Sequence, residues 1–252
     1  MQEQVGTLDD LRCVLEQGKR GVVFTGAGIS TESGIPDFRS PGGVWSKHKP
    51  ILFQDFIASE EARREAWRRK FDDAYGFDGA EPNRGHRAIA RLVRDGKVSV
   101  VITQNTDGLH QMSGIPENKV IELHGNSTYA KCLDCDQRCD LREIKEKFLG
   151  LGILPLCQDC GGLVKAATIS FGQPMPQVPM AKAQEETLVC DFFIAAGSSL
   201  QVYPAAGFPE IAKKNGAKLV IINREPTPLD RIANLIIHRE LGPALGEVTN
   251  VN

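Results

Sequence analysis

A strand followed at once by a glycine pair constrains this chain more than any other feature. Val22 to Thr25 is an apolar, β-branched run, typical of a strand buried in a parallel sheet. Gly26-Ala27-Gly28 comes next, before a run that could open a helix. Glycines at that point let the backbone turn sharply and approach a phosphate, which helix amides can bind. A tight turn without a ligand is the alternative, because such a glycine pair alone is a weak signal.

The residues after this turn argue against an ordinary dehydrogenase. Thr31 stands where the GxGxxG pattern of those enzymes has its third glycine. The chain then enters GIPDFRSPGG instead of a second strand whose acidic end would hold a ribose. Asp37, Phe38 and Arg39 are therefore carried on a loop above the turn. This is a suitable place for chemistry on a bound dinucleotide.

Apolar strand runs alternate with helical patterns along most of the chain. The helical patterns cover 8–17, 53–75, 85–92 and 204–215. The strand runs cover 22–25, 98–103, 120–123, 167–171, 191–196, 218–222 and 235–237. This alternation predicts an α/β fold with a doubly wound, mostly parallel (Rossmann-like) sheet. The polar motifs GAGIS, TQNTD, FGQ, GSS and NRE each begin where a strand run stops, so we expect one crevice to collect them.

Composition limits the setting and the partners. The 252 residues carry a net charge of −2 without a polybasic stretch, so we expect no direct contact with nucleic acid. The N-terminus lacks the basic lead and apolar core of a signal peptide. No apolar run approaches the roughly 20 residues of a membrane span, so we expect no membrane association. These features predict a cytoplasmic location, where the seven cysteines stay reduced.

Four of the cysteines form two CxxC pairs, Cys132 with Cys135 and Cys157 with Cys160. Each pair can place two thiolates on one tetrahedral ion, so together they predict a closed site for one structural Zn²⁺. Redox-active pairs are the rival, but the spacing and the two glycines after the second pair favour zinc. Cys139 lies close by and is expected to be a bystander.

The segment around these cysteines, from about residue 125 to 164, has charges and few strand runs, and it interrupts the α/β pattern. We therefore expect residues 1–40, 85–124 and 165–252 to form a discontinuous nucleotide-binding domain. The helical insertion 41–84 and the zinc-ribbon insertion 125–164 are expected to form a smaller lobe.

Polar residues at the end of the second strand form a further candidate site. Asn105 and Asp107 follow that strand, and capping or turn formation would explain them without a ligand. His110 looks structural in this turn. His124 lies between a strand end and the cysteine segment, where it could be a structural group or a metal ligand. A histidine at neutral pH can also act as a general base.

GAGIS with GIPDFR, together with the later set Gln-Asn-x-Asp-Gly-Leu-His, resembles the sirtuins, the NAD-dependent protein lysine deacylases, of bacterial or archaeal type. The resemblance covers roughly residues 22 to 225. It implies NAD as co-substrate, an acyl-lysine protein or peptide as substrate, and transfer of the acyl group to ADP-ribose with release of nicotinamide. It also gives His124 the role of general base, taking a proton from a ribose hydroxyl.

The resemblance further implies which residues contact NAD. The pyrophosphate is expected at the glycine turn, the nicotinamide near Asn105 and Asp107, and the adenosine side near the late GSS and NRE motifs. The expected contacts are Gly26, Ala27, Gly28, Thr31, Asp37, Phe38, Arg39, Gln104, Asn105, Thr106, Asp107, His124, Gly197, Ser198, Ser199, Asn223, Arg224 and Glu225. The segments 171–173 and 197–205 resemble those that clamp the peptide as an added strand.

Two alternative functions and three departures from the family pattern remain. A mono-ADP-ribosyltransferase could use the same site, and a non-catalytic NAD-sensing zinc module is a rival of another class. Gln173 replaces a common Glu and Ala166 a common Pro, which could shift peptide preference. Sirtuins that prefer succinyl groups share a Tyr-x-x-Arg pair on a helix of the acyl tunnel. The nearest match here is Trp67 with Lys70, which lacks the hydroxyl and the planar fork, so acetyl is expected to be removed faster than succinyl.

Overall fold

The computed structural model describes residues 6–40, 42–74 and 76–252, and its strands form two sheets. The larger sheet has six strands in the order β3-β2-β1-β7-β8-β9, and all neighbouring pairs run parallel. These strands are β1 (Gly21–Thr25), β2 (Val98–Thr103), β3 (Val120–Glu122), β7 (Phe192–Ala196), β8 (Lys218–Ile222) and β9 (Leu235–Ile237). Strands β2 and β3 lie on one side of β1, and β7, β8 and β9 lie on the other, so the chain builds the sheet outward from β1 in both directions. This confirms the doubly wound fold that the sequence predicts.

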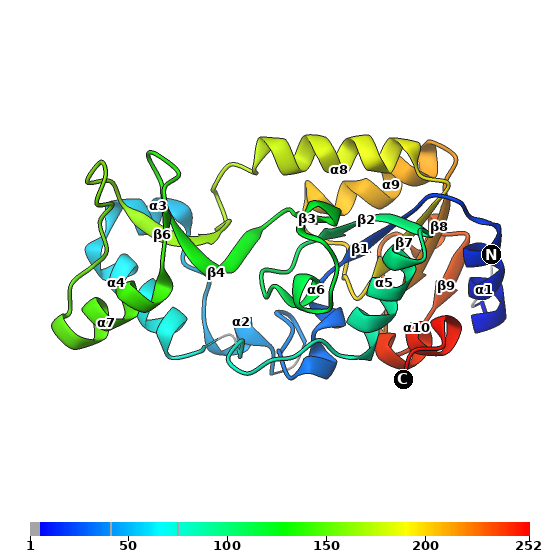
Figure 1. Ribbon diagram of the computed structural model, residues 1–252, viewed down its shortest axis with the longest axis horizontal. Coiled ribbons are helices and arrows are strands. Elements are labelled where there is room, and N and C mark those ends of the chain that lie inside the picture. The colour runs from blue at the N-terminus through cyan, green and yellow to red at the C-terminus, as the bar shows by residue number, and fades with distance from the viewer. Residues whose placement is uncertain (1–5, 41, 75) are drawn as a thin grey trace.

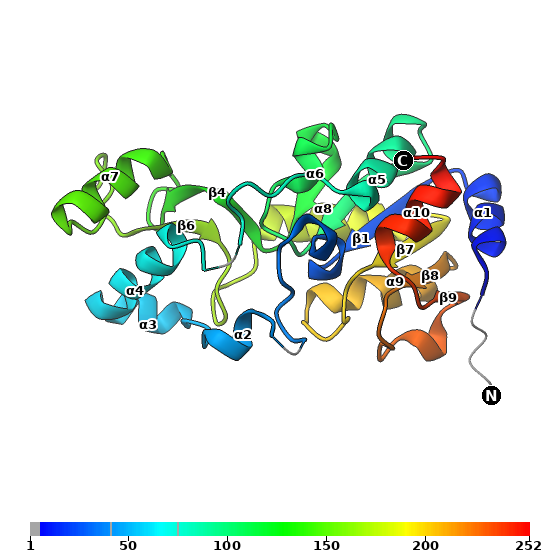
Figure 2. The same ribbon diagram turned by 90° about the horizontal axis from the view of Figure 1, so that it is seen from below.

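Helices cover both faces of the larger sheet (Figures 1 and 2). One face packs against α1 (Leu8–Gln17), α5 (Arg84–Arg94) and α10 (Leu241–Thr249), and the other against α8 (Gln177–Val189) and α9 (Phe208–Lys214). The short α6 (Leu109–Met112) follows β2. Within β1, Val23 belongs to the first core, whereas Val22 and Phe24 belong to the second. All five residues of β1 are buried, which explains its unbroken apolar run.

A smaller lobe lies at the end of the molecule opposite both termini (Figure 1). Its antiparallel sheet has the order β5-β4-β6, with β4 (Gly125–Cys132), β5 (Arg138–Cys139) and β6 (Val164–Thr168). The helices α2 (Val44–Lys47), α3 (Phe53–Ala58), α4 (Glu60–Phe71) and α7 (Leu141–Leu151) complete it. Its own core gathers Trp67, Ile144 and Val164 around two of the cysteines. Two insertions far apart in the sequence therefore share one core.

Three sequence-based predictions of local structure were wrong. The run after Gly28 forms two 3₁₀ turns, η1 (Ala27–Ile29) and η2 (Thr31–Ser33), instead of a longer helix. The helix expected over 53–75 is divided at Ser59, whose backbone is extended and whose Oγ accepts from Ala62 N at 3.2 Å as an N-cap. Its expected end, Tyr75, lies outside the described residues. The strand expected at 167–171 is β6, which lies earlier and pairs with β4 in the smaller sheet.

The residue ranges proposed for the two lobes stay a prediction. The smaller sheet begins at Gly125, as expected, but β6 spans the expected boundary between 164 and 165. Within the described parts of the chain, every helix is too short or too polar to span a bilayer.

Candidate active site and metal centre

A cavity of about 980 Å³ is lined by residues of both lobes. All residues that the sequence predicts to contact the dinucleotide line it. They come from the carboxyl ends of β1, β2, β3, β7 and β8, which meet at one edge of the parallel sheet. The structure thus brings together motifs that are separated by up to about two hundred residues in the sequence.

The glycine turn after β1 packs directly against the turn after β7. Gly28 N donates to Gly197 O at 2.8 Å, and Gly26 N donates to Ala196 O at 3.2 Å. A Cβ on Gly28 would lie only 2.8 Å from Gly197 Cα, and one on Gly26 only 2.8 Å from Gly197 O. Any side chain would therefore force the two turns apart. The glycines keep bare backbone at the cavity wall, as a phosphate-binding turn requires.

Thr31 fills the position of the missing third glycine with a local role. Its Oγ1 donates to Gly28 O at 3.0 Å and so ties the two 3₁₀ turns together. The neighbouring Ser30 was not among the residues singled out from the sequence, although it belongs to the GAGIS motif. Ser30 is buried, lines the cavity and connects two of the predicted polar groups.

Ser30 joins Asn105 to Asp107 in a buried network. Asn105 Nδ2 donates to Ser30 Oγ at 3.1 Å and to Gly26 O at 3.1 Å, and Ser30 Oγ donates to Asp107 Oδ2 at 2.7 Å. Leu109 N donates to the other carboxylate oxygen at 3.0 Å. Burial raises the pKa of Asp107, against these hydrogen bonds, which lower it. The network fixes an amide and a carboxylate side by side in the cavity wall.

His110 lies beneath this network and away from the cavity wall. Its Nε2 is 2.8 Å from Thr25 Oγ1, and Thr25 Oγ1 donates to Thr103 Oγ1 at 2.8 Å. Asn105 N also donates to Thr103 Oγ1, at 3.0 Å. Complete burial and the neighbouring His86 hold the pKa of His110 well below its usual value. A neutral, fully buried imidazole in this chain fits the structural role expected from the sequence.

His124 lines the cavity just before β4. Its Nδ1 lies 3.0 Å from the backbone oxygen of Gln104. Because a carbonyl can only accept, Nδ1 carries the proton and the neutral ring keeps a bare lone pair on Nε2. Burial lowers the pKa of His124, and the Gln104 contact partly offsets this. The ring is therefore neutral at neutral pH and able to accept a proton.

The loop that carries Asp37, Phe38 and Arg39 also reaches the cavity. Asp37 accepts from Ser40 Oγ at 2.5 Å and from the backbone N of Arg39 at 3.0 Å, so its carboxylate orders the loop. The Arg39 guanidinium lies 4.4 Å from the centre of the Trp45 ring. Trp45, on α2, was not predicted. Its ring lies 5.7 Å from that of Phe38 and 5.7 Å from that of Phe171, so it links the loop to the segment after β6.

The late motifs close the other side of the cavity. Ser198 Oγ donates to Gln104 Oε1 at 2.7 Å, which connects the turn after β7 to the end of β2. Asn223 Nδ2 donates to Glu225 O at 2.6 Å and so shapes the turn after β8. The cavity wall also includes Glu240, which begins α10 and which no sequence motif marked.

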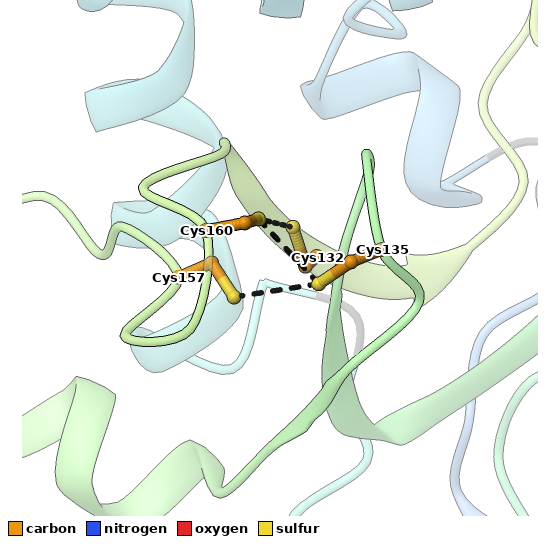
Figure 3. Close-up of side chains that lie close together, drawn as sticks. All are labelled: Cys132, Cys135, Cys157 and Cys160. Atoms are coloured by element: carbon orange, nitrogen blue, oxygen red, sulfur yellow. Dashed lines mark hydrogen bonds between the residues drawn. The ribbon is translucent and has the colours of Figure 1, made fainter.

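The four predicted cysteines meet in the small lobe (Figure 3). All four Sγ atoms lie within 4.8 Å of one another, with closest contacts of 3.5 Å for Cys132–Cys160 and Cys135–Cys160 and 3.6 Å for Cys135–Cys157. Four thiolates at about 2.3 Å around tetrahedral Zn²⁺ would be about 3.8 Å apart. The residues present therefore fit a structural zinc site. Cys139, on β5, is outside this cluster, as expected.

Comparison with known proteins agrees with this fold and site. Residues 26–204 match the Sir2 family. The chain is 58% identical to an NAD-dependent protein deacetylase of Rhodopseudomonas palustris, over 89% of each chain. It is 56% identical to NAD-dependent protein deacetylase 1 of Bradyrhizobium diazoefficiens, over 92% of this chain and 91% of the relative. A solved structure of Sir2 with a p53 peptide and NAD⁺ matches with a TM-score of 0.87 and 35% identity, over 97% of this chain and 98% of that one.

The chain therefore belongs to the Sir2 family, the sirtuins. Within the family it is a bacterial-type sirtuin. The family uses NAD⁺ as co-substrate, and the four-cysteine cluster fits its structural zinc site.

Proposed function

We infer that the cavity between the lobes is the active site of an NAD-dependent protein deacetylase. The chain removes acetyl groups from lysine and transfers them to ADP-ribose, releasing nicotinamide. One observation carries the assignment of the site: every residue that the resemblance predicts to contact NAD lines this one cavity. The non-catalytic rival is not favoured, because the site keeps a titratable histidine with a bare nitrogen beside the predicted nucleotide pocket.

The glycine turn and the Ser30 network bind different parts of NAD. The bare backbone of Gly26 and Gly28 receives the pyrophosphate, while Asn105 and Asp107 receive the nicotinamide. Both Nδ2 hydrogens of Asn105 are used by Gly26 O and Ser30 Oγ. The Asn105 side-chain oxygen is left to accept an amide N–H, which nicotinamide offers. Ser198, Ser199 and the turn after β8 hold the adenosine side.

His124 is the general base of the reaction. The Gln104 carbonyl fixes its tautomer, so Nε2 is free to take a proton from a ribose hydroxyl. Its lowered pKa keeps the ring unprotonated at neutral pH without an acidic partner. Removing a general base costs about 10²–10⁴-fold in rate.

The acyl-lysine peptide binds across the cavity mouth. Residues 171–173 and the loop 197–204, apart from Leu200, line the cavity. We assign these segments to the clamp that takes the peptide as an added strand. Phe171 and Tyr203 are exposed apolar side chains there, with 45% and 61% of their surface accessible. A cytoplasmic location and the absence of nucleic-acid partners remain predictions from composition.

Product analysis tests the function. The purified chain, incubated with NAD⁺ and an acetyl-lysine peptide, should yield nicotinamide, free lysine peptide and O-acetyl-ADP-ribose in equal amounts. Mass spectrometry that finds ADP-ribose attached to protein, with no O-acetyl-ADP-ribose, would favour the mono-ADP-ribosyltransferase instead.

A further inference from the structure

The residue proposed as the general base stands where the chain crosses from one sheet to the other. His124 lies in the short link between β3, which ends at Glu122 in the larger sheet, and β4, which begins at Gly125 in the smaller sheet. Its backbone O accepts from Ile169 N at 2.8 Å, and its Nδ1 donates to Gln104 O at 3.0 Å. The position of the imidazole therefore depends on how this crossing is held.

A side-chain hydrogen bond spans the crossing. Asn126 Nδ2, on β4, donates to Glu122 Oε1, at the end of β3, with a distance of 2.7 Å. Gln111 Nε2, on α6, donates to the same carboxylate oxygen at 2.8 Å. His124 lies midway between Glu122 and Asn126 in the chain, so their bond closes the segment 122–126 into a loop with the base at its centre.

The orientation of the Asn126 amide is fixed by its other neighbour. Asn126 Oδ1 accepts from Thr128 N at 2.7 Å and from Thr128 Oγ1 at 2.6 Å. A backbone N–H can only donate, so the amide oxygen faces Thr128 and the NH2 group faces Glu122. Asn126 is only 7% exposed, so leaving its NH2 group without a partner would be costly. The pair therefore needs an acceptor at position 122 and a donor at position 126.

A second carboxylate would not be tolerated beside Glu122. Burial raises the pKa of Glu122, and the two amides that donate to it lower it. The charges of Asp107 and Glu117 raise it further. The surroundings thus already disfavour one negative charge, and the amide donors are what offset this.

Main-chain contacts hold the crossing independently of this pair. Leu123 N donates to Thr103 O at 2.9 Å, and Ser127 N donates to Thr106 O at 2.8 Å. These bonds attach both ends of the link to the end of β2 and need no side chain of the pair. We therefore expect the chain to fold when the pair is broken, with a less well-ordered link.

Resting on the proposed deacetylase function, we propose that Glu122 and Asn126 are positioning residues that orient the Nε2 lone pair of His124 toward the ribose hydroxyl. Neither of them lines the cavity, so both act through the link and not on the substrate. A reacting group works best when hydrogen bonds of its neighbours lock it in place. The closed loop does this at the one point where the two sheets are joined by so short a link.

Exchanging donor and acceptor tests the proposal. N126D removes the donor and sets a carboxylate against Glu122, so kcat on an acetyl-lysine peptide should fall at least about tenfold, since a misplacement of about 1 Å can cost about 10²-fold. KM for NAD⁺ and for the peptide should stay near the wild-type values. E122Q should keep its activity, because an amide oxygen can accept both bonds. In E122Q/N126D the new amide donates to the new carboxylate, so kcat should recover.

Nitrogen-15 NMR of the His124 ring gives a readout apart from activity. The wild type and E122Q/N126D should carry the proton on Nδ1, whereas N126D should show a mixture of tautomers. The matched control is E117L, which removes an exposed carboxylate from the same region and should keep both kcat and the tautomer. If N126D does not fold, E122L replaces it, because it removes the acceptor without adding charge.

Several outcomes would overturn the inference. They are an unchanged kcat in folded N126D, a low kcat in folded E122Q/N126D, or a raised KM with kcat unchanged, which would indicate a role in binding alone. Failure of N126D, E122L and E122Q/N126D alike to fold would show that the pair is only structural. No acetyl removal by the wild type would instead contradict the proposed function, and the tautomer of His124 would still test the pair.

Discussion

The two lobes share one cavity but are held together by different means. The larger lobe buries a six-stranded sheet between two apolar cores, so its stability comes from area removed from water. The smaller lobe has a three-stranded sheet and a small core that includes Cys132 and Cys157. A core of that size stabilises little by itself, and small lobes of this kind depend on a metal. The cavity thus has one wall fixed by packing and one fixed by a metal centre.

Removing the metal should have the largest effect on the folding of the smaller lobe and on activity. We expect one zinc per chain, and C157S should lose it, because structural zinc sites contribute about 10 kcal/mol or more in small domains. The small lobe should then become sensitive to proteolysis and deacetylation should be lost, while the larger sheet stays folded. C139S is the control and should keep both zinc and activity. Metal analysis that finds no zinc in the folded wild-type chain would contradict this account.

Truncating the core of the larger lobe should affect the whole chain. Phe24 is fully buried and packs on Phe193 with ring centres 6.1 Å apart, so F24A should cost about 3–5 kcal/mol in the free energy of unfolding. Val178 on α8 is 78% exposed, so V178A should change it by less than about 0.5 kcal/mol. Denaturant unfolding compares them. A small loss for F24A would show that the larger lobe does not depend on this core.

The contact between the turns after β1 and β7 should be sensitive to a single methyl group. G28A places a Cβ 2.8 Å from Gly197 backbone, so we expect about 1–3 kcal/mol of destabilisation and weaker NAD binding. Gly150, on α7, has open space around it, and G150A should be neutral or slightly stabilising. Calorimetry of NAD binding and thermal unfolding measure both. If the two variants had the same stability and the same affinity for NAD, the role assigned to the turn would be wrong.

The sequence predicted the bounds of those elements of the larger lobe whose structure follows from their own residue pattern. The run Lys218–Ile222 and the helix Leu8–Gln17 have the bounds expected of them. The long helices α8 and α10 of this lobe were not predicted, and each contains a proline, Pro179 and Pro243. Both prolines lie in the first turn of their helix, where no intrahelical hydrogen bond needs their missing N–H. The partner of a strand is not encoded in its apolar run, so β6 was assigned to the wrong sheet.

Sequence also predicted which residues gather at the cavity, because polar motifs at the ends of parallel strands must meet. It did not predict roles for Ser30, Trp45 or Glu122. The first two are important through contacts with residues far away in the chain, such as Asp107 for Ser30 and Phe171 for Trp45. Glu122 ends an ordinary strand run, and the two side-chain amides that donate to it meet it only in the folded chain.

The pH dependence should show the smallest effect and sharpen the assignment of the base. Burial lowers the pKa of His124 below 6.5, and the neutral ring is the active form. The kcat/KM for deacetylation should therefore be constant around neutral pH and fall about tenfold per pH unit once the pH drops below this pKa. A loss of activity that begins above pH 6.5 would mean that another group, or a raised pKa of His124, controls the rate.

The most direct measurement of the central claim is the deacetylation rate of H124A alongside its affinity for NAD⁺. The account predicts that kcat falls at least ~100-fold while NAD⁺ binding stays close to that of the wild type, since the ring acts on a proton and the glycine turn holds the nucleotide. Wild-type-like turnover by folded H124A would contradict it.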